Sequence, residues 1–322
     1  MPEFSHFFRA MGTDVGLWLW HQDEQLARQA LAETEQFFAQ TEARLSRFQP
    51  NSELSQLNGA AGQPFAASGL LFELVDAALT WRNRTDGIFD PAVLNALIAH
   101  GYDRSFEKII READRDDLPA PIIAPTPAQI QLNRANLSIT LPVGVGLDLG
   151  GLAKGWTVQQ AGQQLGQLGP ALVDAGGDIV CMDRPPTGSP WLIGLSNPHQ
   201  PETDLATLTL TNEAVATSSL AHRRWQIGNR QAHHLIDPRT GAPADTDLVS
   251  VTVIARRLPD AEIFAKVALI LGAADGLAYL QAQPDVSALL VTPTGRQLTC
   301  GNFEEKAYVY SPNFSDTFVN LV

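Results

Sequence analysis

Apolar positions along this chain follow two spacings, which predict its main elements. Val15, Leu17 and Leu19 alternate with other residues in the segment Thr13–Trp20, and this spacing of two predicts an early strand. Residues 26–45 carry apolar side chains at helical spacing, which predicts an amphipathic helix. A second helical stripe follows Ser68, whose hydroxyl is a typical helix N-cap.

The second half of the chain reads as short strands with two helices between them. One predicted helix follows Gly150-Gly151 and ends near Gly169, and the other opens at Asp260 and ends near Gly272. Residues 114–127, charged and then Pro-rich, predict a connecting loop. The mixture predicts an α+β fold, and we expect one domain over residues 1–322. The short β-like runs are 137–141, 171–174, 191–195, 205–210, 249–255 and 288–292.

Composition narrows the classes of function. An apolar share of 44% over 322 residues is normal for a globular protein. The formal charge of −13 argues against nucleic acid and anionic membranes as partners, because both require clustered Lys and Arg. No apolar run is long enough to span a bilayer, and the start shows neither a secretory signal nor a cysteine for lipid. Cys181 and Cys300 are isolated thiols, which fit a reducing cytoplasm. Together these features lead us to expect a cytoplasmic location without membrane attachment.

The segment from His233 to Gly241 combines reactive groups with turn residues. His234 precedes Asp237 by three residues, and Pro238 and Gly241 then turn the backbone. An imidazole exchanges protons near neutral pH, and a carboxylate within reach can orient it. The alternative is an ordinary surface loop that contains histidine.

A glycine-containing run over residues 147–156 is the second candidate. Gly150 and Gly151 would allow close approach of a ligand to the backbone, and the helix that follows offers free N–H groups and Lys154 to a phosphate. The spacing fits neither a Walker loop nor a Rossmann fingerprint. The segment is interpreted as a strand end, a turn and a helix start that could bind a ligand. The alternative is the closely packed start of a helix, with Lys154 in solvent.

Four further segments carry turn or polar residues. Asp174 to Asp178 and Gly87 to Pro91 are acidic turns, and such loops at strand ends often hold ligands. Phe48 follows the first long helix and could stack on a planar ligand or belong to the core. Residues 216–219 include Ser218 and offer hydroxyls to a ligand, or form only a polar turn.

Taken in order, these motifs resemble the ApbE family of FAD:protein FMN transferases, and they span nearly the whole chain. The resemblance implies an α+β fold with mixed sheets, flanking helices and an FAD cleft. It also implies that the FAD pyrophosphate is cleaved, that FMN is attached to a Thr or Ser hydroxyl of an acceptor flavoprotein, and that AMP leaves. The matching segments are 11–13, 46–54, 87–91, 147–156, 175–178, 214–219, 234–241 and 261–272.

Site residues follow from the resemblance by position. His234 is expected to deprotonate the acceptor hydroxyl, with Asp237 as the second catalytic residue. Mg²⁺, the usual cofactor of the family, is expected to be held by the Ala153 carbonyl, Glu262 and Ala265. The residues expected to contact FAD are Met11, Phe48, Phe89, Asp90, Asp148, Lys154 and Ile236, to which the hydroxyl run adds Ser218.

The metal segment departs from the family pattern. Members commonly have A-D-x-x-A-T, whereas this chain has Ala261 to Lys266 as A-E-I-F-A-K. A protonated Lys266 has only donors and would repel a divalent cation beside it. Three interpretations remain: a weakened metal site, an ordinary ion pair between Glu262 and Lys266 on one helix face, or an ammonium that replaces part of the metal's charge. The competing functions are a transfer-inactive FAD-binding protein and a pyrophosphatase that converts FAD to FMN and AMP.

Overall fold

The computed structural model describes residues 1–111, 129–221, 224–227 and 230–308, and the chain divides into two compact units. Unit 1 comprises Met1–Phe38, Lys154–Ala221 and Thr246–Val322, and unit 2 comprises Ala39–Ala153 and His222–Asp245. That residues 1–322 form a single domain stays a prediction. The connecting loop expected over residues 114–127 lies outside the described residues.

Unit 1 is built on an eight-stranded sheet in which every neighbouring pair is antiparallel. Its order mixes early and late strands, so the sheet is completed only by contacts that are distant in the sequence. In spatial order the strands are β1 (Glu3–Ala10), β2 (Thr13–Trp20), β6 (Ala171–Ala175), β7 (Asp178–Met182), β10 (Ala214–Ser219), β15 (Ser250–Ala255), β16 (Ser287–Val291) and β17 (Gln297–Cys300).

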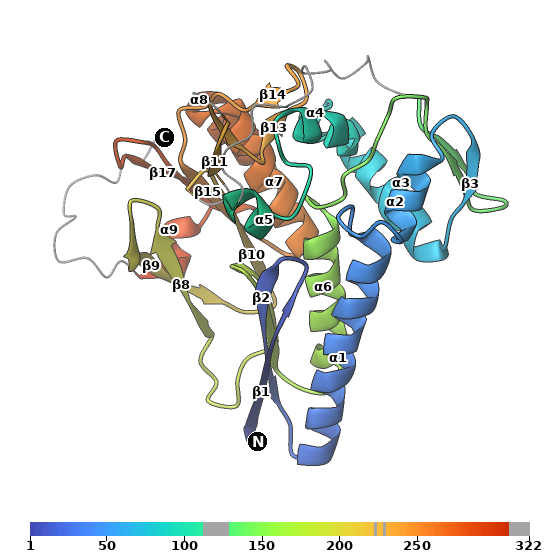
Figure 1. Ribbon diagram of the computed structural model, residues 1–322. Coiled ribbons are helices and arrows are strands. Elements are labelled where there is room, and N and C mark those ends of the chain that lie inside the picture. The colour runs from blue at the N-terminus through green and yellow to red at the C-terminus, as the bar shows by residue number, and fades with distance from the viewer. Residues whose placement is uncertain (112–128, 222–223, 228–229, 309–322) are drawn as a thin grey trace. The chain divides into compact units, whose positions relative to one another are not determined.

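Helices cover one face of this sheet. α1 (Glu24–Leu45) and α6 (Ala153–Gly166) run side by side, and Phe37 and Trp156 bring their ring centroids to 6.1 Å (Figure 1). A Cβ at Gly162 would collide with Val180 of β7, so the α6 backbone lies directly on the sheet. α7 (Leu258–Leu271) packs on β10 and β15, and α8 (Ala273–Gln281) packs on α7.

The other face of the sheet carries a second, three-stranded sheet. Its strands are β8 (Trp191–Asn197), β9 (Gln200–Leu210) and β18 (Ala307–Tyr308), and the short α9 (Phe303–Lys306) precedes β18. Alternation along β7 explains the layering, because Val180 faces α6 whereas Ile179 and Cys181 join the core against β8 and β9. Apolar residues on both sides of β7 therefore bury both faces of the large sheet.

Unit 2 is mainly helical, with short strands. A three-stranded sheet has the order β3 (Pro64–Ala66), β5 (Ser138–Thr140), β4 (Gln131–Asn133). Its core cluster includes Leu97, Tyr102, Trp225 and Ile236. The remaining elements are α2 (Glu53–Gly59), α3 (Gly69–Arg84), η1 (Pro91–Val93), α4 (Leu94–Ala99), α5 (Phe106–Arg111), and the hairpins β11 (Arg224–Ile227) with β12 (Arg230–His233) and β13 (Ile236–Asp237) with β14 (Ala242–Pro243).

Most predicted elements are confirmed. β2 has the predicted bounds, α1 covers residues 26–45, and the Ser68 hydroxyl accepts a hydrogen bond from the Leu71 N–H at 3.3 Å. Each of the six β-like runs coincides with or overlaps a strand. In the described ranges no helix is long and apolar enough to cross a membrane.

Three expectations need correction. A further helix, α8, begins directly after Gly272, whose φ of +85° ends α7. Residues 216–219 belong to the strand β10, so the alternative of a polar turn there is wrong. Leu147 ends no strand, because its backbone N–H and C=O are bound instead by the side-chain amide of Asn58, at 2.8 and 2.9 Å.

Candidate functional site

The predicted site residues fall into two groups, one in each unit. Unit 1 holds Met11, Lys154, Ser218, Glu262 and Ala265. Unit 2 holds the others, namely Phe48, Phe89, Asp90, Asp148, Ala153, His234, Ile236 and Asp237.

In unit 1 the matching segment 11–13 and the predicted turn 174–178 lie together at one end of the sheet. Met11 and Gly12 connect β1 to β2 with φ of 53° and 72°, and Gly176 and Gly177 connect β6 to β7 with φ of 66° and 88°. The Gly176 N–H donates to the Asp14 carbonyl at 3.1 Å, and a Cβ at Gly176 would collide with the Thr13 hydroxyl. Glycine is therefore required here both by φ and by the close approach.

Lys154 lies in this group as an ion-paired side chain. Its ammonium contacts the Asp178 carboxylate, and the two side chains are only 17% and 8% exposed. Burial raises the pKa of the neighbouring Asp174 carboxyl, against the opposing effects of the Gly177 N–H and the Lys154 charge. The alternative with Lys154 in solvent is therefore wrong.

Glu262 joins α7 to the beginning of α6. Its carboxylate, 7% exposed, accepts a hydrogen bond from the Gly155 N–H at 3.1 Å. The first N–H groups of a helix lack intrahelical partners and favour negative charge. Gln159 adds a second link, because its side-chain oxygen accepts from the Leu258 N–H at 2.8 Å. Glu262 thus acts as a helix cap supplied from a neighbouring helix.

The described donors do not fit an all-protein Mg²⁺ site. In that part of the chain no group of three or more His, Cys, Asp or Glu side chains could hold a metal ion. Glu262 offers one carboxylate, already bound to Gly155, and Lys266 follows one turn later. Ala265 lies inside α7, where carbonyls accept the helix's own hydrogen bonds. Mg²⁺ prefers six oxygens, so substrate and water would have to supply most of them.

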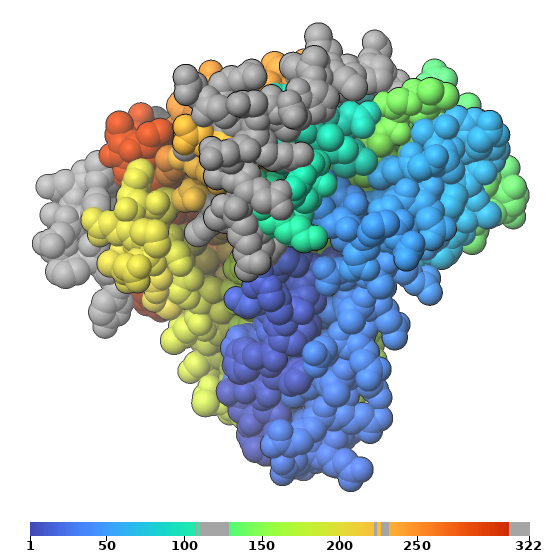
Figure 2. Space-filling model, in the orientation of Figure 1, coloured from blue at the N-terminus to red at the C-terminus, as the bar shows by residue number. Residues whose placement is uncertain are grey.

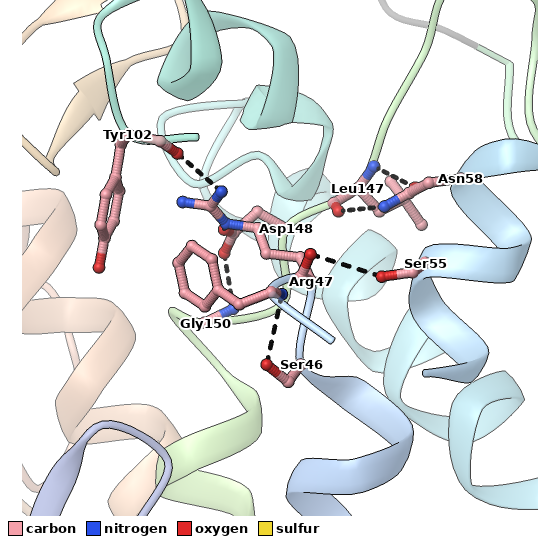
Figure 3. A network of polar contacts seen from close by, with 9 residues as sticks. Ser46, Arg47, Ser55, Asn58, Tyr102, Leu147, Asp148 and Gly150 are labelled. Carbon is pink, nitrogen blue, oxygen red and sulfur yellow. Dashed lines mark hydrogen bonds and ion pairs between the residues drawn. The ribbon is translucent and has the colours of Figure 1, made fainter. Parts of the chain in front are cut away.

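In unit 2, Arg47 and Asp148 form the centre of a polar network (Figure 3). Arg47 Nε contacts the Asp148 carboxylate, and Arg47 Nη1 donates to the Tyr102 carbonyl at 2.7 Å. The Gly150 N–H binds the other Asp148 oxygen at 2.7 Å, and the Asp148 N–H donates to the Pro91 carbonyl at 2.8 Å. Three predicted motifs, 46–54, 87–91 and 147–156, therefore meet at Asp148.

The 87–91 turn places its two predicted residues differently. Asp90 caps η1 by accepting from the Ala92 N–H at 2.8 Å, and it binds Arg82 Nε at 2.7 Å. Phe89 is 5% exposed and its N–H donates to the Thr85 hydroxyl, so most of its ring belongs to the core of this unit. Contact of either residue with FAD stays a prediction.

The histidine segment is less exposed than a surface turn would be. Leu235, Ile236 and Asp237 are 3%, 5% and 7% exposed. Ile236 packs in the core cluster of Tyr102 and Trp225. Because the Tyr102 carbonyl binds Arg47, this cluster connects the histidine segment to the motif 46–54. The alternative of an ordinary surface loop is therefore wrong for these three residues, whereas the predicted turn after Asp237 is confirmed.

Asp237 has a partner that was not predicted, Arg239. Arg239 binds its carboxylate through Nε at 2.9 Å, Nη2 at 2.8 Å and the backbone N–H at 2.9 Å. His233 Nε2 lies 3.1 Å from the Ala244 carbonyl, and burial lowers the pKa of this imidazole. His233 is therefore neutral at pH 7, and His222 lies outside the described residues. The catalytic role of His234 stays a prediction.

A common feature is that each of four site carboxylates has a cation from its own unit. Asp90 pairs with Arg82, Asp148 with Arg47, Asp178 with Lys154 and Asp237 with Arg239. Such pairing removes net negative charge where an anionic ligand would approach. None of the three arginines was assigned a role from the sequence, although Arg47 adjoins Phe48 and Arg239 follows Asp237 closely.

Ser218 lies on the strand β10 opposite Val251 of β15. Its neighbour Thr217 shares a hydrogen bond with the Thr252 hydroxyl at 2.9 Å. The hydroxyl run is thus anchored by strand pairing, and the contact of Ser218 with FAD stays a prediction.

Comparison with known proteins gives a consistent result. The sequence profile of the ApbE family matches residues 11–290. An FAD:protein FMN transferase from Klebsiella pneumoniae is 29% identical, with 90% of this chain and 89% of that protein covered. One from Treponema pallidum is 30% identical, with 88% and 83% covered. The crystal structure of the ApbE protein from Thermotoga maritima superposes with a TM-score of 0.81 at 23% identity, covering 95% of this chain and all of the other, which confirms the α+β fold.

Proposed function

Because the chain belongs to the ApbE family, we propose that it is an FAD:protein FMN transferase. The observation that carries the proposal is the match over most of both chains to relatives with that activity. Its substrates are FAD and an acceptor flavoprotein with an exposed Thr or Ser, and neither nucleic acid nor a membrane is a partner. The cytoplasmic location expected from the sequence stays a prediction.

The reaction moves one phosphoryl group. The acceptor hydroxyl oxygen bonds to the phosphorus on the FMN side of the pyrophosphate, the bond from that phosphorus to the bridging oxygen breaks, and AMP leaves with that oxygen. We assign the hydroxyl proton to the His234 imidazole, because a neutral imidazole is a suitable base near pH 7. Catalysis of this kind consists mainly of positioning and charge neutralisation, so basic groups such as Lys154 are expected near the phosphates.

The rival activities differ from transfer in what accepts FMN. A pyrophosphatase uses water and releases AMP without an acceptor, and a binding protein releases none. The donor set around Glu262 and Lys266, which does not fit an all-protein Mg²⁺ site, is the observation that favours the binding protein among these rivals. Incubation of the chain with FAD and Mg²⁺, with and without an acceptor flavoprotein, followed by measurement of AMP and bound flavin, separates the three.

The residue test uses His234→Ala. We expect transfer to fall about 10²–10⁴-fold while the Kd for FAD stays nearly unchanged, because a general base acts on the acceptor hydroxyl. His199→Ala, at an exposed position, is the matched control and should transfer at the normal rate. Transfer by His234→Ala at the rate of the unaltered chain would remove His234 from the mechanism without touching the assignment of function.

A further inference from the structure

We propose that Arg47 is a positioning residue that fixes the Asp148 carboxylate for FAD binding. The inference rests on the proposed function and on the assignment of Asp148 to FAD. It gives a role to Arg47, which lies in the matching segment 46–54 but was not among the predicted site residues, and it explains why Asp148 can serve as a rigid acceptor.

The Arg47 guanidinium is held on several sides. Its Nε binds Asp148 and its Nη1 donates to the Tyr102 carbonyl at 2.7 Å (Figure 3). Its central carbon lies 4.1 Å from the Phe48 ring centroid and 4.6 Å from that of Tyr102, so the cation lies against both rings. The Tyr102 ring is in turn 5.3 Å from Trp225 in the core cluster. The side chain is 6% exposed, so the guanidinium is enclosed by these contacts.

Stability alone does not account for this arrangement. Arg47 Nη2 is buried and has no hydrogen-bond partner among the described residues. A buried donor without an acceptor destabilises a fold, and such local violations concentrate at functional sites. Of the two nitrogens that do pair, Nη1 binds the Tyr102 carbonyl and Nε binds Asp148, a residue of the predicted FAD site.

The effect on Asp148 is to fix both of its oxygens. Arg47 holds one oxygen and the Gly150 N–H holds the other at 2.7 Å. Each carboxylate oxygen retains a free lone pair, and the side chain is 14% exposed. An ionised carboxylate only accepts hydrogen bonds, so the ligand group it recognises is an N–H or O–H of the nucleotide. Preorganised acceptors bind more tightly because less freedom is lost on binding.

The test is a double-mutant cycle with Arg47→Lys and Asp148→Asn, read out as the Kd for FAD from flavin fluorescence. Lysine keeps the charge but cannot reproduce the planar fork that binds Asp148 and the Tyr102 carbonyl together. We expect each single variant to weaken FAD binding by about tenfold or more, and the double variant to bind no more weakly than Asp148→Asn alone. At saturating FAD the transfer rate of Arg47→Lys should stay within about threefold of the unaltered chain, since only uniform binding is lost.

Arg134→Lys is the matched control, because Arg134 pairs with Asp76 on the surface of the same unit and is 71% exposed. It should leave both Kd and rate unchanged. If Arg47→Lys does not fold, Arg47→Gln replaces it in the cycle, because its amide is planar and carries donors. Failure of both to fold would overturn the proposal, since Arg47 would then serve the fold rather than the ligand.

The remaining outcomes are distinct. Additive losses in the double variant, or a normal Kd in Arg47→Lys, would overturn the role of Arg47 while leaving the transferase assignment in place. Absence of FAD binding by the unaltered chain would overturn the proposed function, and this inference with it.

Discussion

Replacing Gly155 by alanine tests whether Glu262 is a helix cap. Gly155 lies in the first turn of α6, and its N–H donates to Glu262 at 3.1 Å. A Cβ added at this position would lie 2.5 Å from the same carboxylate oxygen. The oxygen is at the end of a flexible side chain, so it can move away, but it then loses this hydrogen bond while remaining in a buried position.

Two opposing effects set the magnitude. Alanine favours a helix over glycine by about 1 kcal/mol. A hydrogen bond to a charged group contributes about 1.5–3 kcal/mol, and the Glu262 side chain is only 7% exposed, so little of it is recovered from water. We therefore expect Gly155→Ala to lower the free energy of unfolding by about 0.5–2 kcal/mol.

Urea denaturation of Gly155→Ala and Gly59→Ala measures the difference. Gly59 ends α2 and a Cβ there would meet nothing within 4 Å, so alanine should stabilise the protein, by up to about 1 kcal/mol. Opposite signs for the same substitution support the cap. A Gly155→Ala variant as stable as Gly59→Ala would refute it, and Glu262 would be free for another role.

Two further substitutions test the charges of unit 1. The raised pKa of Asp174 means that folding favours its protonated form, so its contribution to stability is full below the unfolded value near 3.8 and is lost as pH rises through the folded value. Asp174→Asn should therefore stabilise the protein at pH 7, by an amount that disappears below pH 3.8. Asp245→Asn, at an exposed position, is the control and should not stabilise it. If urea denaturation shows that Asp174→Asn gains as much stability below pH 3.8 as at pH 7, this reasoning is wrong. Lys266→Thr should raise Mg²⁺ affinity in calorimetric titration, with and without FAD, relative to the exposed Lys108→Thr. Strong Mg²⁺ binding by the unaltered chain that Lys266→Thr leaves unchanged would show that Lys266 points away from the metal.

The elements predicted correctly from the sequence are those in which apolar residues recur at a single spacing and are the buried ones. In β2, Leu17 and Leu19 are fully buried and their neighbours are less so, and Phe38 is fully buried on the inner face of α1. β1 was missed because its apolar and polar residues do not alternate as its burial does: His6 lies on the half-buried side, and Phe7 is 64% exposed on the outward side. This edge strand lies in the dark blue surface of Figure 2. β10 was missed because small and hydroxyl residues dominate it, and its strand character comes from pairing with β15.

The sequence predicted several residues of the site but not the ion pairs that they form. Turn chemistry and family resemblance pointed to Asp90, Asp148 and Asp237, but not to the arginine that neutralises each of them. Arg47 and Asp148 are far apart in the sequence, and no local period links them. Such pairs depend on how the chain brings distant segments together, which a single sequence does not encode in any short pattern.

The order of strands in the large sheet has a consequence for synthesis on the ribosome. β2 pairs with β6, which is made about 150 residues later, so the N-terminal hairpin waits roughly eight to thirty seconds for its neighbour. β10 must likewise wait for β15, because His222–Asp245 is made between them and belongs to the other unit. Open strand edges attract other chains. The growing chain is therefore a natural client for factors that shield nascent polypeptides, and slow elongation should cost soluble yield even when the finished protein is stable.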